Sequence, residues 1–141
     1  MNVYVTTSSD DMKALAANML PELIAARVVL LEGVLGSGKT TFAQGVGEAL
    51  GVQRPLRSPT FTLVNQYPVR HEKVDWLIHA DLYRLLHVDG HVLDELGLSE
   101  MLARERSLVL VEWPERLLKK IGGLRLRFEV RDSEHIVSVK K

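Results

Sequence analysis

The 141-residue chain is long enough for one domain with a single core, expected to span residues 1–141, and too short for a second core. Its content of 46% hydrophobic and 26% charged residues excludes a disordered chain, and no apolar run approaches the roughly 18 residues of a membrane span. The sequence has no cysteine for disulfides or thiolate metal sites, and its polar start does not resemble a signal peptide. We therefore expect a cytoplasmic protein without membrane contact.

The charged residues are unevenly distributed along the chain. The formal net charge is zero, so the molecule as a whole has no electrostatic attraction to nucleic acid. Residues 116–141, however, carry eight basic and three acidic residues. This excess has two interpretations. The basic side chains could protect an exposed sheet edge, or they could form a docking face for an acidic partner or RNA.

The first elements along the chain alternate between strand and helix patterns. Val3–Thr6 has the pattern of a short strand, and Ser8 or Ser9 can cap a helix with acidic residues in its first turn. Because proline disfavours a helix interior, we expect this helix to end before Pro21. Arg27–Glu32 contains a continuous apolar run, which predicts a strand buried on both faces of a sheet.

A second helix is expected over Lys39–Leu50, after a glycine-rich loop, with Gly51 as its stop signal. Gly45 and Gly47 inside this helix should each cost about 1 kcal/mol relative to alanine. We expect close packing against the sheet to be the reason for these two glycines. The apolar stripe of the helix is predicted to consist of Phe42, Val46 and Ala49.

The second half of the chain also combines strand and helix patterns. The expected elements are strands at Phe61–Tyr67, Trp76–Ala80 and Leu108–Glu112, a helix over Asp89–Leu102 interrupted at Gly97, and a terminal hairpin of Leu124–Val130 and Ile136–Lys140. Strands and helices mixed around fully apolar strands predict a three-layer α/β fold. The succession of a strand, a glycine-rich loop and a helix at residues 27–50 predicts a P-loop NTPase-like domain, and we expect it to have a mostly parallel central sheet and a C-terminal hairpin.

One segment matches a nucleotide-binding motif at every defined position. Residues 33–40 read Gly-Val-Leu-Gly-Ser-Gly-Lys-Thr, in agreement with G-x-x-x-x-G-K-[ST]. Glycines let the backbone curl so that amide groups converge on phosphate oxygens, and the following helix offers its positive end to the same anion. Lys39 should neutralise the β- and γ-phosphates, and the Thr40 hydroxyl should bind magnesium. The alternative is a glycine-rich turn with a surface lysine, but an apolar strand before the motif and a helix after it favour binding of ATP and Mg²⁺.

Two carboxylates follow strands that the sequence predicts to be apolar. Glu112 is the candidate for a second magnesium ligand, and its alternative role is that of an ordinary carboxylate at a strand end. Asp81 could activate the attacking water or hold a metal-bound water, or it could form an Asx turn at the end of its strand. We expect His79 to be a hydrogen-bonding residue of the site. The candidate catalytic residues are Lys39, Asp81 and Glu112.

Four blocks of the sequence together resemble one known family. The blocks are residues 33–41, Ser-Pro-Thr-Phe-Thr at 58–62, His-Ala-Asp-Leu-Tyr-Arg at 79–84 and Val-Glu-Trp at 111–113. In this order and at these spacings they resemble the TsaE (YjeE) family of small bacterial ATPases, which are needed for making threonylcarbamoyladenosine in tRNA. The resemblance extends over nearly the whole chain and is clearest from Val28 to Glu115.

The resemblance implies a role for particular residues and for partner proteins. It implies that Thr40 and Glu112 bind magnesium and that Asp81 is important for hydrolysis. The implied ATP-binding residues are Gly33, Leu35, Gly36, Ser37, Gly38, Lys39, Thr40, Thr41 and Trp113. The implied switch-like loop near the γ-phosphate includes Ser58, Pro59 and Thr60. The implied partners are TsaD, which transfers the threonylcarbamoyl group, and its companion TsaB. ATP hydrolysis would drive or reset their assembly, with tRNA reached only through the complex.

The sequence departs from the family pattern at several places, and its first helix and final hairpin match the family poorly. Val34 stands where the family usually has an aspartate, so any role of that carboxylate is absent here. The C-terminal arginine of the family has no clear counterpart, because Ser-Glu-His at 133–135 occupies its expected neighbourhood and Arg131 is the candidate substitute. The contacts to the adenine base are therefore left unassigned.

Two other functions are compatible with the same motif. A small-molecule kinase would share the phosphate loop, but such kinases usually have an arginine-rich lid, and here Arg104 and Arg106 flank a predicted strand. A nucleotide-dependent binding switch with little turnover is the second alternative, which Val34 makes more plausible. Stimulation of ATP hydrolysis by proteins, by a metabolite or by neither would separate the three functions.

Overall fold

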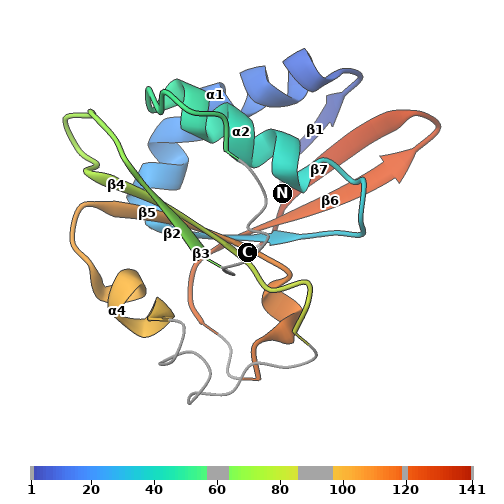
Figure 1. Ribbon diagram of the computed structural model, residues 1–141. Coiled ribbons are helices and arrows are strands. Elements are labelled where there is room, and N and C mark those ends of the chain that lie inside the picture. Colours follow the sequence, from blue (N-terminus) through green and yellow to red (C-terminus); the bar gives the residue numbers. More distant parts are fainter. Residues whose placement is uncertain (1, 57–63, 86–96, 119–120, 141) are drawn as a thin grey trace.

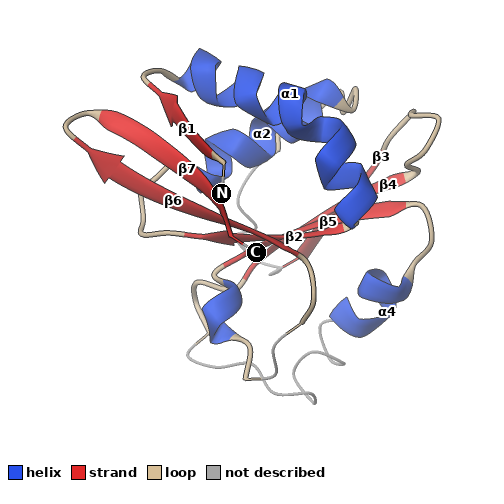
Figure 2. Cartoon of the chain, turned by 180° about the vertical axis from the view of Figure 1, so that it is seen from behind, coloured by secondary structure: helices blue, strands red, loops and turns tan. Residues whose placement is uncertain are grey.

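The computed structural model describes residues 2–56, 64–85, 97–118 and 121–140. Within these residues, seven strands form one sheet in the order β1-β7-β6-β2-β5-β4-β3 (Figure 1). Helices lie on both faces of the sheet, as the two opposite views show (Figure 1 and Figure 2). The three-layer α/β fold expected from the sequence is confirmed.

The centre of the sheet is parallel. β6 (Leu124–Arg131), β2 (Val28–Glu32), β5 (Ser107–Glu112) and β4 (Trp76–Asp81) lie in this order, and each is parallel to its neighbour. All six residues of β5 are buried, which agrees with the continuous apolar run that predicted this strand. Because these strands are parallel, their carboxyl ends meet at one edge of the sheet.

The outer strands are antiparallel. β7 (Glu134–Lys140) pairs with β6 as the expected C-terminal hairpin, and β1 (Val3–Thr6) pairs with β7. On the other side of the sheet, β3 (Val64–Pro68) pairs with β4. The basic segment therefore does not provide the outermost strand of the sheet, which corrects the edge interpretation for Arg125 and Arg127, whereas residues 128–131 of β6 extend beyond the pairing with β2. Its strands β6 and β7 lie between other strands, because β1 adds to the hairpin, and its Arg125 forms an ion pair with Glu32 of β2.

The sheet divides the hydrophobic core into two layers, and helices cover both of them. α1 (Ser9–Ala26) and α2 (Lys39–Ala49) cover one face, and α4 (Leu98–Ala103) with the short 3-10 helix η1 (Pro114–Arg116) lies on the other (Figure 2). Buried side chains of the first layer include Leu23, Leu31, Phe42, Leu77 and Phe128, and those of the second include Leu30, Ile78, Leu82, Leu98 and Val111. Among the described helices, none is both long and apolar enough to cross a membrane.

Helix α1 is longer than predicted. It does not end before Pro21 but continues to Ala26, with Pro21 inside the helix. Leu20 and Leu23, on either side of the proline, are buried in the first core layer. The free energy of burying these side chains offsets the backbone hydrogen bond that proline cannot make. The predicted cap is confirmed, because the Ser8 hydroxyl accepts a hydrogen bond from the backbone N–H of Asp11.

The glycines of α2 face a different neighbour from the one expected. A Cβ atom on Gly45 would lie 2.7 Å from the Cα of Lys13 in α1, and one on Gly47 would lie 2.4 Å from a methyl group of Leu56. Close packing is therefore the reason for both glycines, but the contacts are with α1 and the following loop instead of the sheet. Ala49 is exposed, which corrects the predicted apolar stripe. Gly51 ends the helix as expected, with φ of 78°.

Three predicted segments extend beyond the described residues. Residues 61–63 of the strand predicted at 61–67 and residues 89–96 of the helix predicted at 89–102 lie outside them. Within the described part, Gly97 precedes α4 and is its N-cap residue, with φ of 72°. The predicted switch-like residues Ser58, Pro59 and Thr60 also lie outside the described residues.

Candidate functional site

A glycine loop, defined here as residues 33–38, connects the carboxyl end of β2 to the start of α2. A Cβ atom on Gly33 would lie 2.6 Å from the backbone oxygen of Phe128 in β6, and Gly33 has φ of 155°. Gly38 is the N-cap residue of α2, and its φ of 111° is a conformation that side-chain-bearing residues rarely adopt. The loop therefore presents the N-terminal end of α2 at the edge where the central strands end.

Lys39 lies across the inside of the loop. Its ammonium group donates a hydrogen bond to the backbone oxygen of Gly33 and lies 3.8 Å from the centre of the Trp113 ring. Only 4% of this residue is exposed. Burial lowers the pKa of the Lys39 ammonium, while the negative charges of Glu112, Glu115 and Asp81 act in the opposite direction. The site thus holds a cation next to several carboxylates.

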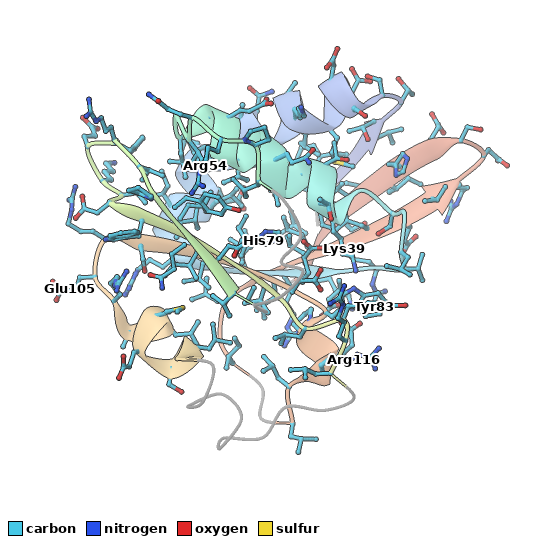
Figure 3. All side chains as sticks on the ribbon, in the orientation of Figure 1. Lys39, Arg54, His79, Tyr83, Glu105 and Arg116 are labelled. Carbon is cyan, nitrogen blue, oxygen red and sulfur yellow. The ribbon has the colours of Figure 1, made fainter. Side chains whose placement is uncertain are left out.

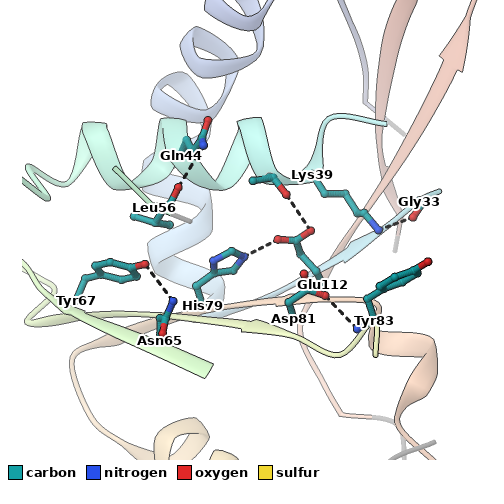
Figure 4. A network of polar contacts seen from close by, with 11 residues as sticks. Gly33, Lys39, Gln44, Leu56, Asn65, Tyr67, His79, Asp81, Tyr83 and Glu112 are labelled. Atoms are coloured by element: carbon teal, nitrogen blue, oxygen red, sulfur yellow. Dashed lines mark hydrogen bonds and ion pairs between the residues drawn. The ribbon is translucent and has the colours of Figure 1, made fainter. Parts of the chain in front are cut away.

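Glu112, the last residue of β5, is held by two side chains from other elements (Figure 4). The Thr40 hydroxyl at the start of α2 donates to its Oε1 atom over 3.5 Å, and Nε2 of His79 lies 2.5 Å from its Oε2 atom. Both His79 and Glu112 are buried. The predicted hydrogen-bonding role of His79 in the site is confirmed.

Asp81 stands opposite Glu112 in the register of β4 and β5. Its Oδ1 atom accepts a hydrogen bond from the backbone N–H of Tyr83 at 3.0 Å, so the Asx turn considered for this residue is present. Burial raises the pKa of the Asp81 carboxyl, and the nearby charge of Glu112 adds to the increase. The Tyr83 amide, His79 and Lys39 lower it. A carboxylate with a raised pKa is a better proton acceptor than an ordinary aspartate.

These groups surround a cavity of about 220 Å³. Its lining residues are Leu35, Gly36, Gly38, Lys39, Thr40, Thr41, Asp81, Tyr83, Glu112, Trp113 and His135. Most of the predicted site residues therefore meet at one place. Gly33, Ser37 and His79 do not line the cavity, because Gly33 packs against β6, the Ser37 side chain is buried beside Gly33, and His79 reaches the site only through Glu112.

Two lining residues were not predicted from the sequence. Tyr83 follows Asp81 by two positions, so the block at 79–84 contained a signal for it, and its ring packs against Trp113 with 5.0 Å between the ring centres. His135 comes from the C-terminal hairpin, where the resemblance placed the neighbourhood of the family arginine at residues 133–135 but did not identify His135 as a site residue. Arg131, the candidate substitute for the family arginine, is not among the residues that line this cavity.

Two larger cavities elsewhere lack this chemistry. They measure about 440 and 500 Å³ and share Arg54 and Tyr67, and their described lining contains no carboxylate and no lysine. In Figure 3, Arg54 lies well apart from Lys39 and Tyr83. We therefore take the smaller cavity beside the glycine loop as the candidate functional site.

The residues around the smaller cavity fit a polyphosphate with a divalent cation. The first backbone N–H groups of a helix and a lysine ammonium are the donors that phosphate oxygens require. The buried Ser37 hydroxyl has no hydrogen-bond partner within the described part of the chain, and it lies beside Gly33 of the same loop. Thr40 and Glu112 bring two oxygen ligands together, as magnesium prefers. No group of three or more His, Cys, Asp or Glu side chains among the described residues is placed to hold a metal, so further ligands for a cation would come from phosphate or water.

An apolar strand, a glycine loop and a helix, with the carboxylate of the adjacent parallel strand beside them, define a P-loop-like α/β protein. The family model described as "Threonylcarbamoyl adenosine biosynthesis protein TsaE" matches residues 6–138. The chain belongs to the TsaE family.

Individual relatives agree with this assignment. The tRNA threonylcarbamoyladenosine biosynthesis protein TsaE of Aquifex aeolicus is 40% identical over 130 residues, which cover 91% of this chain and 86% of the relative. The protein of the same name from Mycobacterium tuberculosis is 34% identical over 128 residues, covering 89% and 76%. The crystal structure of Bacillus subtilis YdiB superimposes with a TM-score of 0.67 at 30% identity, covering 98% of this chain and 83% of that one.

Proposed function

We propose that this protein is a magnesium-dependent ATPase that acts in the biosynthesis of threonylcarbamoyladenosine in tRNA. The names of its relatives support the biosynthetic role. The observation that supports the ATPase activity is the meeting of Lys39, Thr40, Asp81 and Glu112 around one cavity beside the glycine loop. These residues come from three different elements, and their meeting around one cavity supports the proposal that phosphate binding and hydrolysis occur there.

The glycine loop and Lys39 would bind the triphosphate. Backbone N–H groups at the start of α2 point their partial positive charge toward an anion, and the Lys39 ammonium adds a full charge. In the structure this ammonium donates to the Gly33 oxygen, so it exchanges that partner for a phosphate oxygen when nucleotide binds. Because the side chain is already buried, little further desolvation of the ammonium is required.

Thr40 and Glu112 would hold the magnesium ion. When bound, Mg²⁺ supplies positive charge that neutralises the phosphate oxygens. His79 keeps one oxygen of the Glu112 carboxylate engaged, and the other oxygen faces the Thr40 hydroxyl. The chain itself therefore orients the two ligands toward each other.

Asp81 would act on the attacking water. It lines the same cavity as Lys39 and lies opposite Glu112, and its raised pKa suits a group that accepts a proton. The Asx turn to Tyr83 leaves its second carboxylate oxygen for this purpose. The proton of the water would pass to Asp81 as the water oxygen bonds to the γ-phosphorus, and the bond between that phosphorus and the bridging oxygen of ADP would break, so that ADP and phosphate leave.

The partners that we propose are TsaD and TsaB, with tRNA contacted only through their complex and the cytoplasm as the location. Phosphate release from ATP would be measured for the protein alone, with candidate small-molecule acceptors, and with TsaB and TsaD added. We expect slow release alone and stimulation only by the two proteins. Stimulation by a metabolite would identify a kinase instead, and the absence of turnover under every condition would leave a nucleotide-dependent switch.

A further inference from the structure

A hydrogen bond joins the C-terminal hairpin to the glycine loop. Nδ1 of His135 in β7 lies 2.8 Å from the backbone oxygen of Ser37, although the two residues are 98 positions apart. A carbonyl oxygen can only accept a hydrogen bond, so Nδ1 must carry the proton. His135 also lines the cavity of the candidate site. The residue therefore has a contact with the loop that the roles proposed above do not use.

The hairpin places His135 there through its turn and its alternation. Asp132 and Ser133 form the turn with φ of 50° and 69°, which is the left-handed conformation of two-residue hairpin turns. Successive side chains on a strand point to opposite faces, so His135, Val137 and Val139 share one face of β7. Val137 and Val139 are buried in the core layer beneath α1 and α2. At the start of the same row, His135 contacts the loop that leads into α2 through the Ser37 backbone oxygen.

The backbone of His135 is supported on both sides. It is the register partner of Val130 in β6 and of Thr6 in β1, and the Thr6 hydroxyl donates to its oxygen over 3.4 Å. A residue between two paired strands has little freedom to move. The backbone that carries the imidazole is thus held in place where the imidazole contacts the glycine loop.

The bond to Ser37 also sets the direction of the next amide group. The oxygen of Ser37 and the N–H of Gly38 belong to one planar peptide unit and point in opposite directions. Gly38 is further confined, because a Cβ atom there would lie 2.6 Å from the Met12 methyl group and 3.4 Å from Nδ1 of His135. The last peptide of the loop is therefore held between α1 and β7 at the start of α2.

We propose that His135 is a positioning residue of the glycine loop. Its Nδ1–H group holds the peptide between Ser37 and Gly38 so that the Gly38 amide is directed for phosphate binding. His135 also lines a second cavity of about 250 Å³, together with Thr7 and Ser133. The inference rests on the proposed function for its ligand, a triphosphate.

The test uses two substitutions of His135 and one control on the same strand. His135→Leu fills similar space without a donor, and His135→Asn retains an N–H donor close to the place of Nδ1. Glu134→Gln, the control, changes the neighbouring exposed side chain on the opposite face of β7. Binding of magnesium–ATP and of magnesium–tripolyphosphate is measured by calorimetry, and circular dichroism with thermal melting checks the fold.

We expect His135→Leu to weaken both ligands by about fivefold, as the loss of one hydrogen bond predicts, and His135→Asn to recover most of the affinity. The control should bind both ligands like the unaltered protein. Wild-type affinity in the leucine variant would overturn the proposal, and so would an asparagine variant as weak as leucine. A loss for ATP but not for tripolyphosphate would also overturn it, because the ring would then contact the nucleoside instead of positioning the loop.

A ligand-free measurement separates this inference from the proposed ATPase function. In protein with ¹⁵N-labelled histidine, at a pH where the ring is neutral, Nδ1 of His135 should give the signal of a protonated nitrogen and Nε2 that of an unprotonated one. The Gly38 amide resonance should shift in His135→Leu and much less in His135→Asn. If the unaltered protein binds neither ligand but shows these signals, the proposed function fails while the His135 contact stands. The opposite tautomer would reject the contact itself.

Discussion

Nε2 of His79 lies 2.5 Å from Oε2 of Glu112, and the two residues are 0% and 2% exposed. An ionised carboxylate can only accept a hydrogen bond, so Nε2 of His79 donates to Glu112, and Nδ1 of His79 has no partner within the described residues. The pair connects β4 to β5 below the cavity. The other carboxylate oxygen of Glu112, Oε1, faces the Thr40 hydroxyl.

We predict that Glu112→Gln separates the two roles of this carboxylate. The amide oxygen can still accept the hydrogen bond from His79, so the free energy of unfolding should change by less than about 1 kcal/mol. The enhancement of ATP binding by Mg²⁺ should be lost, because a neutral amide is a weaker ligand for a hard cation. Calorimetry with and without magnesium measures this, and the assignment fails if the magnesium effect persists.

Glu112→Ala tests how much the hydrogen bond between His79 and Glu112 stabilises the fold. It removes the partner of His79 and leaves a buried polar group unpaired, so chemical denaturation should show a loss of about 1–3 kcal/mol. Equal stability of the alanine and glutamine variants would mean that the buried bond to His79 does not stabilise the fold.

Replacing Lys39 with alanine should abolish ATP hydrolysis. The loss of a charged hydrogen bond to phosphate corresponds to a decrease in affinity of about 10- to 100-fold. Lys13→Ala is the matched control, because its ammonium forms an exposed ion pair with Glu48 on the outside of α1 and α2. Unchanged turnover in Lys39→Ala would remove the glycine loop from the proposed mechanism.

Asp81→Asn tests whether the Asp81 carboxylate accepts the proton of the attacking water. The asparagine side chain can still accept the hydrogen bond from the Tyr83 amide, so the Asx turn should persist. We expect ATP binding within about threefold of the original and hydrolysis slower by about 100-fold or more, the usual effect of removing a general base. Single-turnover hydrolysis is the measurement, and a normal rate would leave Asp81 with its turn as its only role.

Asp11 makes the stability depend on pH. Hydrogen bonds from the backbone and side chain of Thr7 lower the pKa of its carboxyl below the usual 3.8. A lowered pKa in the folded state stabilises the protein above the unfolded-state value, and this stabilisation is lost as the pH falls through the folded-state value. Asp11→Asn should therefore be less stable than the original near neutral pH and approach it in acid. Urea denaturation across this range measures the difference, which should not stay constant with pH.

Gly45→Ala should destabilise the protein despite the higher helix propensity of alanine. The new methyl group would lie 2.7 Å from the backbone of Lys13, and overpacking of this kind costs about 1–3 kcal/mol against a propensity gain of about 1 kcal/mol. Gly122→Ala is the control, since a Cβ atom there meets nothing within 4 Å. Thermal denaturation of both variants gives the comparison, and a more stable Gly45→Ala would contradict the close contact between α1 and α2.

Local patterns predicted most of the fold correctly. The apolar runs identified β2 and β5, the glycine motif identified the loop before α2, and the alternating residues identified the hairpin of β6 and β7. The errors arose where tertiary packing outweighs local preference. Pro21 stays inside α1 because its neighbours are buried, and Gly45 is required by α1 instead of the sheet.

The sequence by itself determined the glycine loop motif and the positions of the two candidate carboxylates along the chain, because a loop motif and a strand end are local features. Only the tertiary structure decided that Asp81 faces Glu112, that His79 holds Glu112, and that His135 supports Ser37. These contacts depend on the order and register of strands that are far apart in the chain. Register is set by packing of the whole sheet, and no short segment contains that information.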